Sequence, residues 1–179
     1  CKNLKEITLP SSVTSIGDSV FWGCENLKEI NIPSSVTSIG DDAFCSCKNL
    51  KEINIPSSVT SIGNSAFWGC ENLREIILPS GVTSIGYKAF DGCWHLQGIT
   101  LPSSVTSIDN GSFDDCCELR EINVAESNKV YRAIDGVLYT KDLKTIIRYP
   151  ERKEDEKFVI PAGVTSIGDH AFSSCDNLQ

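Results

Sequence analysis

The feature that most constrains this chain is a repeat of 23 residues that runs through most of its length. Its shared pattern reads C-x-N-L-K-E-I-x-[IL]-P-S-x-V-T-S-I-G-x-x-A-F-x-x, and successive copies open at Cys1, Cys24, Cys47, Cys70, Cys93 and Cys116. A unit this short cannot bury its own apolar side chains. It must stack on its neighbours, at about 4.8 Å per copy. The sequence therefore predicts a solenoid.

The array is interrupted once. Five complete copies fill residues 1–115, and the pattern returns over residues 158–179. The stretch between them, 116–157, is expected to form one enlarged rung with a hairpin at Asp135-Gly136, a strong turn signal, and a solvated charged loop over 151–157. We expect a single solenoid over 1–179. Because the sequence contains no Met, even at residue 1, we also expect it to be a piece of a longer chain.

Positions within a copy indicate its local structure. In the first copy, apolar residues alternate with outward-facing polar ones along a short strand that Pro10 ends. Residues 13–16 predict a second short strand, and Gly17 is expected to allow a positive φ. Val20 and Phe21 are expected to fill the next corner on a single helical turn. The predicted fold class is β-rich, with one parallel strand per rung, short second strands and single helical turns.

The unit C-x-x-L-x-x-I-x-[IL]-P-x-x-V-x-x-I-G-x-x-A-F resembles the BspA-like, or Treponema-type, leucine-rich repeats. Residues 135–150 resemble a segment that recurs between such repeats. This resemblance covers essentially the whole chain and implies a leucine-rich-repeat solenoid. It also implies a cell-surface or secreted protein of a kind linked with adhesion to host matrix proteins or to other bacteria. It implies no catalytic residues, because the family motif describes packing.

Composition excludes several functions. The net charge of −8 argues against nucleic-acid binding, and no apolar run approaches the roughly 20 residues of a membrane span. No Ser-His-Asp set, glycine-rich phosphate loop or His-rich metal motif can be assembled around His95 or His170. We therefore expect no enzyme activity, no metal and no cofactor.

The chain has nine cysteines, and seven of them, the six repeat openers and Cys175, share one repeat position. A column of this kind spreads its thiols along a line, whereas a zinc site gathers four ligands around one point. We interpret the column as small buried side chains. Cys45 and Cys117 lie outside it and are the better candidates for oxidation.

The outward face of the first strand is the first candidate site. Glu52 and Glu75 belong to a row of glutamates, and the preceding row of Lys and Arg is expected to cancel much of their charge. Such a face is either simply soluble or a polar recognition surface with Asn54 beside the charges. An uncharged spot that includes apolar Ile77 breaks the pattern, and its residues are Ile77, Gln97 and Gly98. If this face binds a partner, the spot is where we expect contact.

Tryptophans suggest a second candidate site. Trp22 and Trp68 share a repeat position that also takes Cys, Asp and Ser, so we expect it to be partly exposed. Trp94 could extend the same edge. The rings either cover neighbouring turns or form a platform that stacks on sugars.

Three functions therefore remain open. The first is a non-catalytic adhesion module that binds a host matrix protein or another cell-surface protein. The second is a glycan-binding module that uses the tryptophans. The third is a spacer that holds another domain away from the membrane. High similarity between repeats favours a spacer, whereas the local deviations around residues 94–98 favour a site.

Overall fold

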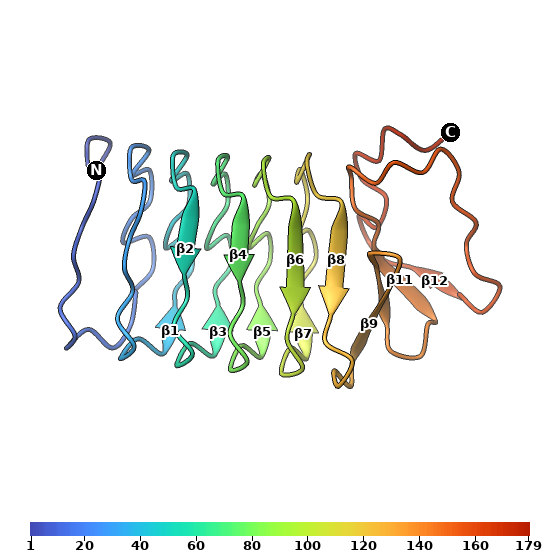
Figure 1. Ribbon diagram of the computed structural model, residues 1–179, viewed down its shortest axis with the longest axis horizontal. Coiled ribbons are helices and arrows are strands. Elements are labelled where there is room, and N and C mark those ends of the chain that lie inside the picture. The colour runs from blue at the N-terminus through green and yellow to red at the C-terminus, as the bar shows by residue number, and fades with distance from the viewer.

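The computed structural model describes residues 1–179 as a solenoid of stacked rungs, with the two termini at opposite ends of the array (Figure 1). The first strands of successive rungs form one parallel sheet, here called the front sheet: β2 (Glu52–Asn54), β4 (Glu75–Ile77), β6 (Gly98–Leu101) and β8 (Glu121–Val124). The second strands form another: β1 (Ser38–Ile39), β3 (Ser61–Ile62), β5 (Ser84–Ile85) and β7 (Ser107–Ile108). The predicted solenoid with two parallel strand series is confirmed.

The parallel register places identical repeat positions side by side. Glu52 pairs with Glu75 and Ile53 with Ile76 across β2 and β4, and the same 23-residue offset recurs through both sheets. Isolated bridges continue the front sheet to Thr8. Each repeat position therefore becomes a column of side chains along the solenoid.

After β8 the regular array ends, and the chain forms a third sheet. It contains β9 (Tyr131–Ile134), β10 (Val137–Thr140), β11 (Thr145–Arg148) and β12 (Ser166–Ile167), in the order β12-β11-β10-β9. The hairpin expected at Asp135-Gly136 is present between β9 and β10, with positive φ at both turn residues. Ile122 of β8 donates its amide hydrogen to the Gly136 carbonyl, so this turn sits against the front sheet.

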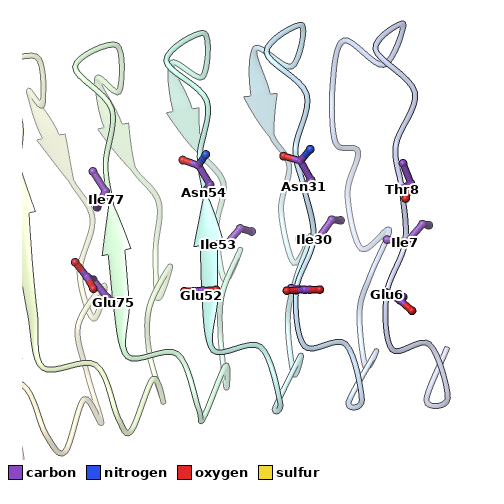
Figure 2. A pocket seen from close by; sticks show the side chains of 11 residues that line it. Glu6, Ile7, Thr8, Ile30, Asn31, Glu52, Ile53, Asn54, Glu75 and Ile77 are labelled. Carbon is purple, nitrogen blue, oxygen red and sulfur yellow. The ribbon is translucent and has the colours of Figure 1, made fainter.

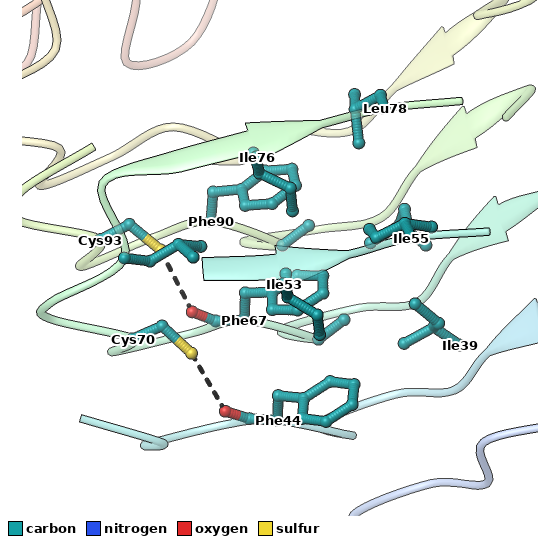
Figure 3. Packing of buried hydrophobic residues seen from close by; sticks show 14 of the residues in the cluster. Ile39, Phe44, Ile53, Ile55, Phe67, Cys70, Ile76, Leu78, Phe90 and Cys93 are labelled. Carbon is teal, nitrogen blue, oxygen red and sulfur yellow. Dashed lines mark hydrogen bonds between the residues drawn. The ribbon is translucent and has the colours of Figure 1, made fainter. Parts of the chain in front are cut away.

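Two columns dominate the interior (Figure 3). The phenylalanine rings of consecutive rungs stack nearly parallel, and Phe67 lies 5.4 Å from both Phe44 and Phe90 between ring centroids. Beside them, the cysteine column is buried as predicted from Cys24 to Cys116. From Cys47 to Cys116, each thiol donates to the phenylalanine carbonyl of the preceding rung, as Cys70 does to Phe44 at 3.2 Å. A small side chain with a hydrogen-bond donor fits this corner.

The corner before each cysteine differs from the expectation. No helical turn forms there, because residues 18–23 make consecutive tight turns with positive φ at Ser19 and Gly23. A helix requires negative φ throughout. The positive φ expected at Gly17 is also wrong, since Gly17 and its equivalents keep negative φ while Ser19 and its equivalents do not. The chain reverses two residues later than the glycine suggested.

The glycine is required by contact between rungs instead. A Cβ at Gly63 would lie 2.5 Å from the backbone carbon of Gly40, and one at Gly86 would lie 2.6 Å from the Asn64 nitrogen. Both distances are shorter than any real contact, and both partners are backbone atoms that cannot swing away. The column of glycines therefore lets adjacent rungs approach to sheet spacing.

Gly63→Ala is expected to lower the free energy of unfolding by about 1–3 kcal/mol, because rungs must separate to admit the methyl group. Urea unfolding followed by circular dichroism measures the loss. Gly163→Ala is the matched control, since a Cβ there has no atom within 4 Å. Equal midpoints for the two variants would contradict the role assigned to Gly63.

A buried ion cluster joins the regular rungs to the last part of the chain. The Arg148 guanidinium, at the end of β11, donates to Asp114 at 3.1 Å and to Glu151 at 2.5 Å. It also donates to the backbone carbonyl of His170. Glu151 was expected in a solvated loop, and that prediction is wrong for this residue, because Arg148 pairs with its carboxylate inside the protein. Burial raises the pKa of Glu151 to about 7.

Candidate functional site

The front sheet presents two rows of outward side chains, which run along the solenoid on either side of the isoleucines that point inward (Figure 2). The glutamate row consists of Glu6, Glu29, Glu52, Glu75 and Glu121. The second row consists of Thr8, Asn31, Asn54, Ile77, Thr100 and Asn123. Parallel in-register pairing creates both rows, because one repeat position of each rung lies next to the same position of the next rung.

A groove of about 470 Å³ runs between the rows over the first four rungs. Four glutamates line one side of it, Thr8, Asn31 and Asn54 line the other, and Ile77 lies at its end. No lysine or arginine lines this groove. The side-chain amides of Asn31 and Asn54 make no hydrogen bond within the protein, although the asparagines at turns do, as Asn49 does with the Glu25 carbonyl. The groove therefore offers free acceptors on one side and free amides on the other.

The expected cancellation of charge along the glutamate row does not occur by direct pairing. No carboxylate of this row lies within 4.0 Å of a Lys or Arg nitrogen. Of the basic row, Arg120 pairs with Glu154 at 3.1 Å. At the adjoining turns, Lys48 pairs with Glu71. The front sheet therefore keeps an uncompensated negative row.

Ile77 interrupts the second row and Gly98 interrupts the first. The Ile77 side chain is 71% exposed, the highest value for any large apolar residue of the front sheet. A second groove, of about 420 Å³, adjoins the first at Ile77 and is lined also by Gln97 and Gly98. Because Gly98 lacks a side chain, the row of glutamates is interrupted there, and the Glu121 side chain approaches within 3.5 Å of the place that a Cβ would occupy. The structure thus brings Ile77, Gln97, Gly98, Glu75 and Asn54 to one stretch of surface.

The tryptophans lie on a different surface, at turns: Trp22 and Trp68 stand two residues before a repeat cysteine, and Trp94 directly follows Cys93. Trp22, Trp68 and Trp94 are exposed by 62%, 42% and 46%. Exposure at this repeat position depends on the residue: Cys45 and Asp91 occupy the same position and are buried. The expectation of a partly exposed position is therefore confirmed for Trp22, Trp68 and Ser173, and is wrong for Cys45 and Asp91.

Cys45 was expected to be a good candidate for oxidation, and the structure contradicts this. Its side chain is buried, the Trp22 side chain lies against its thiol, and burial raises its pKa. A thiol that stays protonated and inaccessible is a poor nucleophile. Cys117 is exposed, as expected of a residue outside the column.

The histidines serve packing contacts. His95 replaces the turn asparagine of other rungs and its Nδ1 lies 2.6 Å from the Glu71 carbonyl, the same contact that Asn72 makes with Lys48. His170 lies 3.0 Å from Asp114 beside the buried ion cluster. No group of three or more His, Cys, Asp or Glu side chains is placed to hold a metal ion. No helix is long and apolar enough to cross a bilayer.

Sequence reasoning missed two contributors to this face. Asn123 continues the second row and donates to Glu121 at 3.0 Å, which partly satisfies the last glutamate. Arg74 lines the groove beyond Ile77, and it is the basic side chain there. The outward position of Asn123 could have been predicted from its place in the repeat. The direction of the Arg74 side chain could not, because the 23-residue repeat does not determine it.

Comparison with known proteins agrees with this architecture. The family model described as BspA type leucine rich repeat region matches in six copies, over residues 1–120, 37–151 and 149–179. No curated protein sequence matches the chain.

Several solved structures are similar along nearly the whole chain. The pneumococcal vaccine antigen PcpA superposes with a TM-score of 0.85 at 28% identity, over 98% of this chain and 44% of that one. The T. pallidum leucine rich repeat protein TpLRR gives 0.68 at 26% identity, over 97% and 78%. A leucine rich cell surface protein from Faecalibacterium prausnitzii gives 0.54 at 32% identity, over 97% and 62%. The chain therefore spans less than half the length of PcpA.

Proposed function

Because this chain belongs to the BspA-type leucine-rich repeat family, we propose that it is a non-catalytic protein-binding module of a cell-surface or secreted protein and that it mediates adhesion. The family suggests protein interaction as the general role. Two of the similar structures are described as a vaccine antigen and a cell surface protein, which supports the location. A host matrix protein or another cell-surface protein is the proposed class of partner.

The observation that carries this proposal is the exposed Ile77 within a polar sheet face. The other exposed large apolar residues of the regular rungs lie at turns, namely Val20, Trp22, Trp68, Tyr87 and Trp94. Ile77 is the exposed one on the front sheet, and an isolated apolar side chain flanked by grooves is typical of an interface anchor. The surrounding polar rows suit the rim of such an interface.

The solenoid favours binding because its backbone is fixed before the partner arrives. Each rung donates hydrogen bonds to the rung before it, as Arg74 does to Lys51 at 3.1 Å between backbone atoms. Side chains on this grid lose little backbone freedom on association, so less of the contact energy is spent on ordering. A rigid face of this kind can bind without rearrangement.

Ile77→Arg is expected to weaken binding of a protein partner by about thirtyfold or more, because it replaces the apolar anchor with a desolvated charge. The measurement is a screen of the folded chain against immobilised host matrix proteins. Circular dichroism of the variant should be unchanged, since the side chain is exposed.

Val20→Arg is the matched control, because Val20 is also an exposed aliphatic residue but lies on a turn away from the front sheet. The control should bind like the unmodified chain. Binding that survives Ile77→Arg would remove this face from the proposal.

The exposed tryptophans favour a second candidate function, glycan binding. Trp22 and Trp68 lie two rungs apart, about 10 Å, and both side chains are exposed. A glycan array probed with the Trp22→Ala/Trp68→Ala double variant tests it. Loss of glycan binding in that variant would make this the leading function, whereas matrix binding that survives it supports the front sheet.

A further inference from the structure

We propose that the groove of the front sheet binds a short basic segment of a protein partner, with one aliphatic side chain of that segment against Ile77. This inference rests on the proposed function and adds the chemistry of the partner. The occupant is polypeptide, rich in lysine or arginine, and it lies along the solenoid axis across several rungs.

The first step is charge complementarity. Four glutamates line one wall of the groove, none of them is paired, and no basic side chain lines the groove. Rungs repeat about every 4.8 Å, so like charges stand close enough to repel each other. A cationic segment relieves this repulsion at each rung, and a neutral one does not.

The second step separates a polypeptide from a small cation. The carboxylates form a line, one per strand, and do not converge on one point, so no set of three acidic side chains is placed to hold a metal ion. The opposite wall carries the free amides of Asn31 and Asn54. Amides of this kind can donate to and accept from the backbone of a bound chain. A linear site with carboxylates on one side and amides on the other matches a linear peptide.

The third step fixes the length of the segment and its end. From Glu6 to Glu75 there are three rung intervals, about 14 Å, which about five extended residues span. The groove ends at Ile77, whose side chain is exposed beside the gap left by Gly98. An aliphatic side chain at the end of the basic segment can pack there. Charge would then supply steering and orientation, and the aliphatic contact would supply specificity.

The probe for the test is a fluorescein-labelled synthetic peptide of about five lysines with a leucine at each end, so that either direction of binding is accommodated. Its affinity for the folded chain is measured by fluorescence anisotropy. We expect it to bind several-fold more tightly than the same peptide with alanine in place of leucine. The Glu52→Gln/Glu75→Gln variant should bind it about tenfold more weakly.

A matched variant carries the same change of net charge elsewhere. Glu126→Gln/Glu156→Gln removes two exposed glutamates that lie outside the groove and pair with no basic side chain. It should bind the peptide within about twofold of the unmodified chain, because screening limits distant charges to about one Debye length. Equal weakening by both double variants would show attraction by net charge alone and would overturn the inference. So would the absence of measurable binding at low salt.

The two proposals fail differently. If Ile77→Arg abolishes capture of a matrix protein and Glu52→Gln/Glu75→Gln leaves it intact, the front sheet binds proteins but not through a basic segment. If neither variant changes that capture, the front sheet is not the interface: the basic-segment inference fails, and protein binding is then carried by another surface. If both variants reduce it, and the control does not, both are supported.

Discussion

Arg148→Met is expected to lower the free energy of unfolding by about 3–5 kcal/mol, because it leaves two carboxylates inside the protein without their cation. Asp114 and Glu151 both accept hydrogen bonds from this guanidinium, and both are buried. Methionine keeps the length and apolar stem of the side chain, so the loss reports the charge and the hydrogen bonds. The measurement is guanidinium-free denaturation in urea, since a guanidinium salt would screen the cluster.

Tryptophan and tyrosine signals report on different parts of the chain, so they show which part Arg148→Met destabilises. All three tryptophans lie in the regular rungs, whereas three of the four tyrosines, Tyr131, Tyr139 and Tyr149, lie in the last part of the chain and only Tyr87 lies in the regular rungs. We expect the near-ultraviolet signal of the tyrosines to be lost at lower urea than the tryptophan fluorescence, because the smaller apolar cluster at the end depends on Arg148 for its link to Asp114. Arg152→Met is the control, as Arg152 is exposed and forms no ion pair. A loss no larger than that of the control would show that the cluster adds no stability.

Phe67→Ala is expected to cost about 3–5 kcal/mol as well, through a cavity in the middle of the ring column. Phe67 is completely buried, and its ring stacks on those of Phe44 and Phe90. The surrounding rungs are held at a fixed spacing by backbone hydrogen bonds, so they cannot collapse into the space. Both neighbours lose a stacking partner in addition.

The residue next in sequence provides the comparison. Trp68→Ala removes a larger side chain, but 42% of it is exposed, so we expect a loss well below that of Phe67→Ala. Urea unfolding followed by far-ultraviolet circular dichroism suits both variants, because it does not depend on Trp68 fluorescence. A larger loss for Trp68→Ala would mean that the indole, not the phenylalanine column, holds the corner together.

Features that recur in every copy could be predicted from the sequence, because stacking of the rungs places the same repeat position of each copy in one column of side chains. The buried cysteines, the turn asparagines and His95, and the outward rows of the front sheet all follow from position in the repeat. The exposed spot at Ile77 and Gly98 could be found for the same reason, as a departure from that period.

Features that depend on one particular neighbour could not be predicted. The repeat places glycine at residue 63, but a requirement for positive φ and a requirement for close backbone approach both predict glycine, so the pattern does not distinguish them. Cys45 is buried because of the indole of Trp22, which its own position in the pattern does not reveal. Arg148 meets Asp114 across 34 residues, and Arg148 itself lies in the stretch that lacks the repeat.

The direction of the hydrogen bonds between rungs has a mechanical consequence. They run along the axis of the solenoid and perpendicular to its strands, so tension applied along that axis loads the bonds of one rung boundary at a time, in series. Under such tension the end rung would peel away before the interior ones. Each rung that opens would add 23 residues, about 80 Å of extended chain, to the tether. A chain built in this way yields to tension along its axis by lengthening stepwise while its remaining rungs stay folded.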